Sequence, residues 1–243
     1  MLRVANPATE PVRRVVSLVP SLTEAVAWSA PELLVGVTDW CTHPADLTAS
    51  RVGGTKNPRV DEVVALAPDV VLVNTEENRE ADLARLRQAG LQLWVTDYET
   101  VPDALDGLET MLEALGLGRP AWLPGARASW ARAWEGPRCR ALVPIWRRPW
   151  MALGRDTFAG DLLARIGVDN LMASSPDRYP KVDLDELPAY DIVVLPDEPY
   201  RFTAVDGPEA FSVPARLVSG RHLTWYGPSL AEARDLLVAQ IWP

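Results

Sequence analysis

The chain has few residues that could bind a metal, because it contains only two histidines, His43 and His222. Cys41 lies two positions before His43 in a polar segment. A neutral imidazole is a common axial ligand of chelated iron. The sequence therefore predicts His43, opposed by His222 from the other half of the chain, as candidate metal ligands, while an ordinary surface role for either ring stays open.

Arginines and aromatic residues follow several predicted strands, in positions suited to a bulky ligand. Arg147 and Arg148 are adjacent, and a guanidinium group fits a carboxylate or phosphate. Solvated loop charge is the equally simple alternative for this pair, and Arg178 is a weaker candidate of the same kind. Aromatic walls with a few polar anchors are typical of ligand sites. The predicted ligand-binding residues are Ser21, Trp40, Lys56, Asn57, Asn74, Tyr98, Arg147, Trp150, Tyr179, Glu198, Trp225 and Tyr226.

Motifs of several enzyme classes are missing from the sequence. There is no paired-histidine zinc motif, no Cys-x-x-Cys and no Gly-x-Ser-x-Gly nucleophile elbow. The segment Gly53-Gly54-Thr55-Lys56 lacks the spacing of a phosphate-binding loop. We therefore expect a binding protein rather than an enzyme, and keep an enzyme built on the same scaffold as the lower alternative.

Strand-like and helix-like segments alternate along the chain, which predicts an α/β fold with mainly parallel sheets. The predicted strands cover residues 14–19, 33–37, 69–73, 91–96 and 140–146. The predicted helices cover residues 21–29, 79–89, 102–115, 157–166 and 229–241. Ser21 with Glu24, and Ser229 with Glu232, have the spacing of capping boxes that begin helices.

A sequence pattern of the first half of the chain is repeated in the second half. An acid-led helix and an apolar strand begin at Asp61-Glu62, and a similar phrase begins at Asp185-Glu186, an offset of 185 − 61 = 124 residues. The repeat predicts two similar lobes, at residues 1–115 and 137–243, joined by a single long connecting helix at 116–136. Ligands of open α/β sheets bind beyond the carboxyl ends of the strands, so we expect a ligand cleft between the lobes.

Charge and hydropathy exclude two classes of binding partner, nucleic acids and the membrane interior. A net charge of −9 disfavours nucleic-acid binding, and no apolar run is long enough for membrane insertion. The two cysteines, Cys41 and Cys139, are expected to be free thiols. The amino terminus lacks the apolar core of a signal peptide. The protein is expected to be cytoplasmic if Met1 is the native start, and periplasmic or extracytoplasmic if a signal was removed.

Three stretches, Arg14–Glu24, Val60–Val73 and Arg178–Leu187, resemble the class III substrate-binding proteins of ABC importers. This group is the helical-backbone metal receptor superfamily, and its cobalamin-binding branch is the most similar. The resemblance implies a monomeric, two-lobed binder of cobalamin, haem or a ferric siderophore, with no intrinsic cofactor. It also implies docking to arginines of an ABC permease through acids that fall at Asp61, Glu62, Asp185 and Glu186.

An alternative hypothesis assigns the same fold to a protein that takes no part in transport. In that hypothesis the chain is a cytoplasmic carrier or sensor of a cofactor or small molecule.

Overall fold

The computed structural model describes residues 11–243, so the first ten residues, where a signal segment was sought, lie outside the described residues. The chain forms two compact units. The first unit contains residues up to Asp97, Leu105–Leu123 and Tyr226–Pro228, and the second contains Tyr98–Ala104, Pro124–Trp225 and Ser229–Pro243. Helix α4 (Val101–Ala114) therefore contributes residues to both units. The predicted lobe boundaries at 115 and 137 stay a prediction.

The first unit is built on a five-stranded parallel sheet in the order β3-β2-β1-β6-β7. These strands are β1 (Val15–Ser17), β2 (Leu34–Val37), β3 (Ser50–Arg51), β6 (Val70–Asn74) and β7 (Leu93–Thr96). The central strands are buried along their whole length, which explains their continuous apolar sequence. A small antiparallel pair, β4 (Gly53–Gly54) and β5 (Asn57–Pro58), follows the sheet's edge strand.

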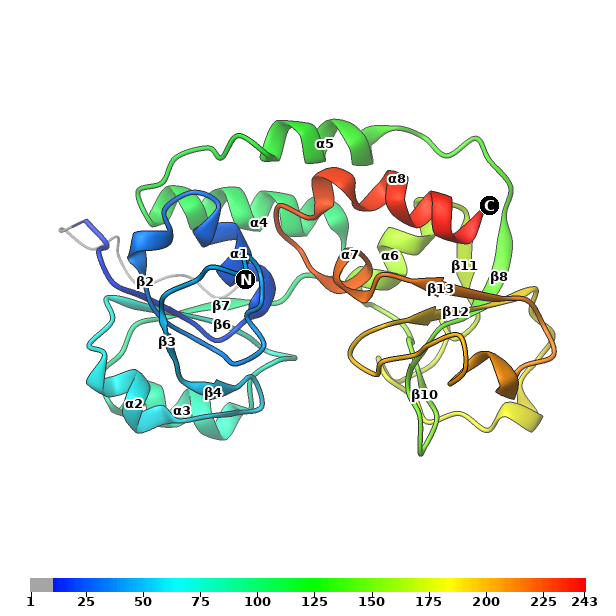
Figure 1. The fold of residues 1–243 in the computed structure, drawn as a ribbon, viewed down its shortest axis with the longest axis horizontal. Helices are drawn as coiled ribbons and strands as arrows, with labels where there is room; N and C mark the ends of the chain where they lie inside the picture. Colours follow the sequence, from blue (N-terminus) through cyan, green and yellow to red (C-terminus); the bar gives the residue numbers. More distant parts are fainter. Residues whose placement is uncertain (1–10) are drawn as a thin grey trace. The chain divides into compact units, whose positions relative to one another are not determined.

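Helices of the first unit pack on this sheet through regularly spaced apolar residues. They are α1 (Pro20–Ala27), α2 (Val60–Ala65) and α3 (Glu80–Gln88), with a short 3-10 turn η1 (Pro31–Leu33) before β2. Val63 of α2 and Leu83 and Leu86 of α3 join the same core cluster as alternate residues of β1 and β6. Helices α2 and α3 consequently lie on the same side of the sheet (Figure 1).

The second unit has a four-stranded parallel sheet in the order β11-β8-β12-β13. Its strands are β8 (Cys139–Leu142), β11 (Val168–Asn170), β12 (Ile192–Pro196) and β13 (Ala215–Val218). A separate antiparallel pair is formed by β9 (Pro144–Trp146) and β10 (Met151–Ala152). Together the two sheets confirm the predicted α/β class with parallel strands in two related units.

The two sides of the second sheet are covered differently. Helices α6 (Phe158–Ala164), α7 (Gly220–Thr224) and α8 (Leu230–Ile241) gather on one side (Figure 1). A second core cluster joins Leu142, Val193 and Leu195 of the strands to residues of irregular segments, among them Trp150, Phe202 and Phe211. Two 3-10 turns, η2 (Leu184–Glu186) and η3 (Pro208–Ala210), belong to these segments. Loops rather than long helices therefore bury this apolar surface.

The predicted connecting helix at 116–136 is wrong in its extent. The helix in that segment, α5, spans only Leu123–Ala131. Gly116 and Gly118 adopt positive φ angles of 78° and 62°, which end α4 and prevent a continuous helix. At the other end, Arg234 donates hydrogen bonds to the carbonyl oxygens of Ser129 and Arg132, 2.7 Å each, so these groups have a partner outside the helix.

Both predicted capping boxes are also wrong. Helix α1 begins at Pro20, so Ser21 lies inside its first turn, and Val19 is the N-cap residue. Ser229 is the N-cap residue of α8, as predicted, but its side chain makes no capping hydrogen bond. Glu232 accepts a hydrogen bond from His222 instead. In α8, a tertiary partner of Glu232 has therefore replaced the local one.

The predicted free thiols are confirmed, since Cys41 and Cys139 are both unpaired and buried. Within residues 11–243, none of the helices combines the length and apolar character needed to cross a membrane.

Candidate functional site

The predicted ligand-binding residues lie in both units, and each set is described within its own unit. In the first unit, Asn74 and Asn78 organise the loop after β6. The Asn78 side chain accepts a hydrogen bond from the Asn74 backbone N–H (2.9 Å) and donates to the carbonyl oxygens of Leu18 and Thr55 (3.2 and 3.0 Å). Asn78 thereby ties the ends of β1 and β6 to the β4–β5 hairpin, where backbone groups have no strand partner.

Asn74 completes this network. Its amide group donates to the Thr96 carbonyl oxygen at the end of β7 (3.1 Å), and its side-chain oxygen accepts from the backbone N–H groups of Glu76 and Glu77 (2.8 and 3.1 Å). Such a turn is the usual chemistry of an asparagine after a strand. Asn74 is buried, so it shapes the loop, and its predicted ligand contact stays a prediction.

Lys56 meets the same loop from the hairpin. Its Nζ atom donates to the Glu76 carbonyl oxygen, and its charge opposes the effect of burial on Glu77. Burial prevails and raises the pKa of the Glu77 carboxyl above its ordinary value. The loop therefore holds a cation beside acidic residues rather than an isolated cation.

Among the other predicted residues of the first unit, exposure differs widely. Trp40 is 65% exposed, which leaves most of its indole surface available. Asn57 is exposed, whereas Ser21 and Tyr226 are buried. Trp40 is thus the aromatic residue of this unit with the most surface to offer a ligand.

The Cys41–His43 pair does not converge on one point. The Cys41 Sγ atom is buried between the hydroxyl groups of Thr23 and Thr38, at 3.0 and 3.1 Å, and burial raises the pKa of its thiol. His43 is exposed, and its Nδ1 atom lies 3.1 Å from the Thr42 hydroxyl. These contacts favour a structural cysteine and a surface histidine.

The second unit contains a compact ion cluster between Arg147, which directly follows β9, and acids of the irregular segment after β12. Arg147, whose side chain is 17% exposed, forms ion pairs with Asp206 and with Glu209 (2.6 Å). The Tyr200 hydroxyl donates to Asp206 (2.7 Å), and the Gly207 backbone N–H donates to Glu209 (2.6 Å). Arg147, predicted from the sequence as an anchor for a ligand anion, is therefore bound by two carboxylates of its own chain.

Aromatic rings enclose this cluster. The Arg147 guanidinium lies 5.1 Å from the centre of the Trp150 ring, and Trp150 stacks on Phe202 at 6.0 Å. Trp146 meets Tyr200 edge to face at 5.6 Å and stays 44% exposed. Trp150, a predicted ligand residue, is thus partly used in packing, and Trp146 is the more open ring.

The cluster changes the acidity of its members. The hydrogen bond from Tyr200 lowers the pKa of Asp206, with further lowering from the charges of Arg147 and Arg148. The Gly207 backbone N–H, and then the contact with Arg147, lower the pKa of Glu209. Both carboxylates are held in their charged form.

His222 has partners at both ring nitrogens. Nδ1 lies 2.7 Å from the Ser219 hydroxyl, and Nε2 lies 3.0 Å from Glu232. No group of three or more His, Cys, Asp or Glu residues within 11–243 is arranged to hold a metal ion. The predicted metal roles of His43 and His222 stay predictions without a supporting contact.

The remaining predicted residues of the second unit are more enclosed. Trp225 is buried, with the Arg221 guanidinium 5.9 Å from its ring centre. Tyr98, Tyr179 and Glu198 are half-buried, and burial raises the pKa of Tyr98. None of these contacts tests a ligand role, so their assignment stays a prediction.

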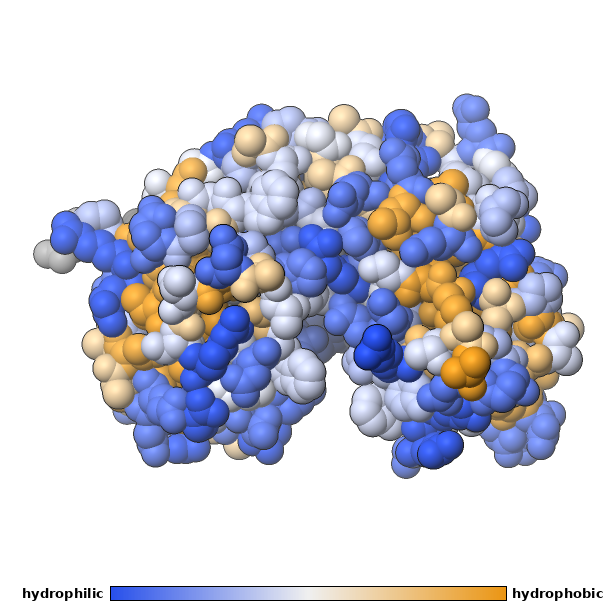
Figure 2. All heavy atoms as spheres, in the orientation of Figure 1, coloured by the Kyte–Doolittle hydropathy of each residue, from blue (hydrophilic) through white to orange (hydrophobic). Residues whose placement is uncertain are grey.

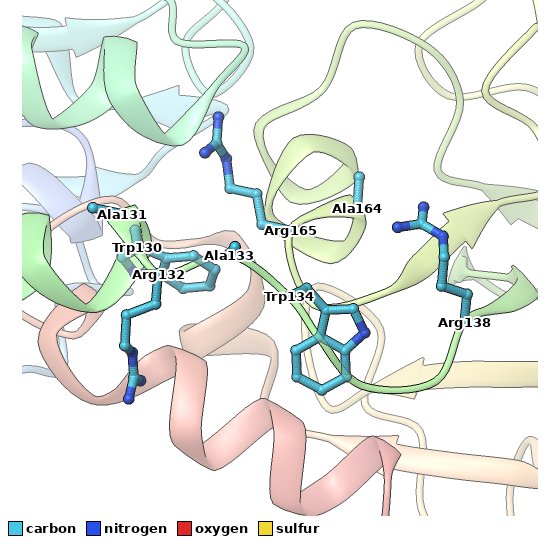
Figure 3. Close-up of a pocket in the computed structure, with 8 residues that line it drawn as sticks. All are labelled: Trp130, Ala131, Arg132, Ala133, Trp134, Arg138, Ala164 and Arg165. Carbon is cyan, nitrogen blue, oxygen red and sulfur yellow. The ribbon is translucent and has the colours of Figure 1, made fainter.

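A surface pocket of ≈ 300 Å³ lies beside α5 and α6, away from all of these predicted residues. It is lined by Trp130, Ala131, Arg132, Ala133, Trp134, Arg138, Ala164 and Arg165. Figure 3 shows Arg132 and Arg165 pointing in opposite directions. Each of its three arginines has an acid partner, Asp235, Asp169 or Asp161. The pocket therefore does not gather its positive charge on one point.

Sequence reasoning missed Asn78, Asp206 and Glu209. Asn78 had a usable signal, since it follows Asn74 by four residues in a polar loop after a strand. Asp206 lies 59 positions from Arg147, in an irregular segment without periodicity. The partners of Arg147 could be found only from the fold.

Replacing Asn78 tests the network of the first unit. Asn78→Ala leaves the Leu18 and Thr55 carbonyl oxygens without this donor, so the free energy of unfolding should fall by about 2–3 kcal/mol. Urea titration measures the change. The exposed Asn57→Ala variant is the control and should stay within about 0.5 kcal/mol. Equal losses in the two variants would contradict the role of Asn78.

Acid titration tests the cluster of the second unit. Because the folded pKa of Asp206 is lowered, its contribution is complete above the unfolded value of about 4 and is lost as the pH falls through the folded value. Asp206→Asn should lower the melting temperature at neutral pH, and the difference from wild type should shrink near pH ~3. Asp235→Asn, in an exposed pair, is the control. A difference that does not vary with pH would count against this charge effect.

The fold and several sequence stretches are similar to known proteins, although no family model matches the chain. A vitamin B12-binding protein of Vibrio cholerae is 23% identical over 188 residues, which cover 73% of this chain and 67% of that protein. An uncharacterized ABC transporter substrate-binding lipoprotein of Bacillus subtilis is 32% identical over 113 residues, 45% of this chain and 36% of that protein.

A solved structure of a heme-binding protein is similar as well. The periplasmic heme-binding protein RhuT from Roseiflexus superposes with a TM-score of 0.75 at 20% identity, covering 94% of this chain and 97% of that chain. The likeness at this identity establishes the fold. Together, sequence and fold confirm the predicted resemblance of this chain to the class III substrate-binding proteins of ABC importers.

Proposed function

We propose that this chain is a non-catalytic binding protein that captures a metal chelate or similarly bulky cofactor for an ABC importer. The observation that carries the proposal is the pair of parallel sheets whose carboxyl-end loops present aromatic and polar side chains, in a fold shared with B12-binding and heme-binding proteins. Capture requires only desolvation, stacking and hydrogen bonds, so no covalent step is involved.

Cobalamin, haem and ferric siderophores are the candidate ligands. Trp40 and Trp146 supply exposed indole surface for stacking on a macrocycle, one in each unit. Lys56 and Tyr98 are polar candidates on the loops that follow β4 and β7. The proteins compared above are binding proteins by name, which supports a carrier without an intrinsic cofactor.

The same proposal implies that the protein acts outside the cytoplasm. The solved structure compared above is described as periplasmic, which supports an extracytoplasmic site of action for this chain. Neither comparison supports the alternative of a cytoplasmic carrier or sensor without transport, or that of an enzyme on this scaffold.

The permease contact is assigned to the repeated acids. Asp61 has a side chain that is 96% exposed, and its pair with Arg85 (3.2 Å) is a weak surface ion pair. The surface over α2 and α3 is largely hydrophilic (Figure 2). Asp185 and Glu186 are exposed on η2 of the second unit. Each unit thus offers acids that an arginine of a permease could pair with.

Thermal shift tests the ligand class. Cyanocobalamin, dicyanocobinamide, haem and a ferric siderophore should be screened at about 100 times the expected Kd, where binding adds about 2.7 kcal/mol to the free energy of unfolding. At least one chelate should raise the melting temperature clearly. Failure of all of them, with a metabolite library equally silent, would overturn the proposed function.

Charge reversal tests the docking acids. The double variant Asp61→Arg/Asp185→Arg should bind the cognate permease, reconstituted in lipid nanodiscs, at least about tenfold more weakly, because like charges would then meet across the contact. Its affinity for the ligand should not change. Glu113→Arg, at an exposed position of α4, is the matched control. Unchanged permease binding by the double variant would refute this docking role.

A further inference from the structure

Arg147, predicted to attract a ligand anion, is neutralised within the second unit, whereas the neighbouring Arg148 is exposed and forms no ion pair with the described residues. Arg147 is bound by Asp206 and Glu209, and the charge of Arg148 also acts on Asp206. Two cations and two carboxylates leave this part of the loop surface without net charge. Arg147 therefore offers no free guanidinium to a carboxylate-bearing ligand.

The cluster is fixed from several directions. Tyr200 holds Asp206, the Gly207 backbone N–H holds Glu209, and the Arg147 guanidinium packs against the Trp150 ring. The Arg147 side chain is mostly buried. Releasing it would break two charge-assisted contacts and leave two carboxylates beside the incoming ligand. A ligand anion would therefore lose more than it gained at this position.

Two other arginines of the second unit are also near acids. Arg178 lies 3.7 Å from Glu99, and Arg221 lies 3.6 Å from Glu232. In the first unit, Lys56 lies close enough to Glu77 to affect its pKa. Exposed rings such as Trp146 stay available for stacking, which does not depend on ligand charge.

We propose that Asp206 and Glu209 are specificity-determining residues: by binding Arg147, they make the surface after β9 and β12 favour chelates with an uncharged rim over chelates with a carboxylate rim. This inference rests on the proposed function. Amide-bearing corrinoids are the uncharged class, and corrinoid acids, haem with its propionates and anionic siderophores are the disfavoured class.

A matched pair of ligands isolates rim charge from ring shape. Dicyanocobinamide and dicyanocobyrinic acid share cobalt, cyanide ligands and the corrin ring, but the first carries amides where the second carries carboxylates. Titration calorimetry at about 0.1 M salt, where charges still act over about 10 Å, measures both affinities. The wild-type protein should bind the amide form at least about tenfold more tightly than the acid form.

Neutralising the two acids tests their role directly. In Asp206→Asn/Glu209→Gln, Arg147 is freed, so the acid form should bind at least about tenfold more tightly than to wild type. The amide form should change by less than about threefold. Asp235→Asn removes an acid that pairs with Arg132 elsewhere in the unit and should change neither affinity. If the double variant does not fold, the single variants and the wild-type comparison still decide.

The outcomes separate this inference from the proposed function. Equal or tighter wild-type binding of the acid form, of haem or of an anionic siderophore would overturn the inference and leave the proposed function standing. An unchanged ratio in the folded double variant would overturn the role of Asp206 and Glu209. Silence toward every chelate would overturn the proposed function, and the inference would fall with it.

Discussion

Parallel strands end at one edge of a sheet, and the backbone groups just beyond that edge have no strand partner. The rest of this structure depends on how side chains satisfy them. In the first unit, Asn78 binds the backbone of Leu18, Thr55 and Asn74 at once. In the second, charged and aromatic side chains around Arg147 join the segments that follow β9 and β12. One unit thus has a rigid polar loop there and the other an ion cluster closed by rings, and both place their loops where ligands of α/β sheets bind.

The internal repeat explains why the units are related but not equal. Asp61 and Asp185 begin similar phrases, yet the first becomes an α-helix and the second only a 3-10 turn. Pro68 lies seven residues after Asp61, whereas Pro188 lies three residues after Asp185. An early proline removes a backbone donor and blocks the first full turn of a helix. Loss of this helix leaves apolar strand residues to be covered by loops, and the aromatic residues of those loops surround Arg147.

The fold could be predicted from local signals, and much of the site could not. Continuous β-branched runs identified β1, β6 and β12, because strands buried on both faces have few polar residues. β13 (Ala215–Val218) was missed, since it is short and only Val218 of its four residues is buried. The capping box at Ser229 failed because Glu232 has a distant partner, His222. Asp206 and Glu209 gave no local signal, because their role arises only when β9 and the loop after β12 meet.

The acidic composition explains why the partners of Arg147 could not be predicted from the sequence. The chain has 33 acidic residues against 24 lysines and arginines, so a cation on a loop is surrounded by more acids than it can pair with. Folding brings such acids within reach over long sequence separations, and a partly buried guanidinium is stable only with such partners. In a chain of this charge, the acids around an arginine therefore decide whether it can bind a ligand anion, and the residue type alone does not. Arginine is a residue type that binds ligand anions, but the charge of Arg147 is already neutralised by Asp206 and Glu209, and its guanidinium packs against the Trp150 ring.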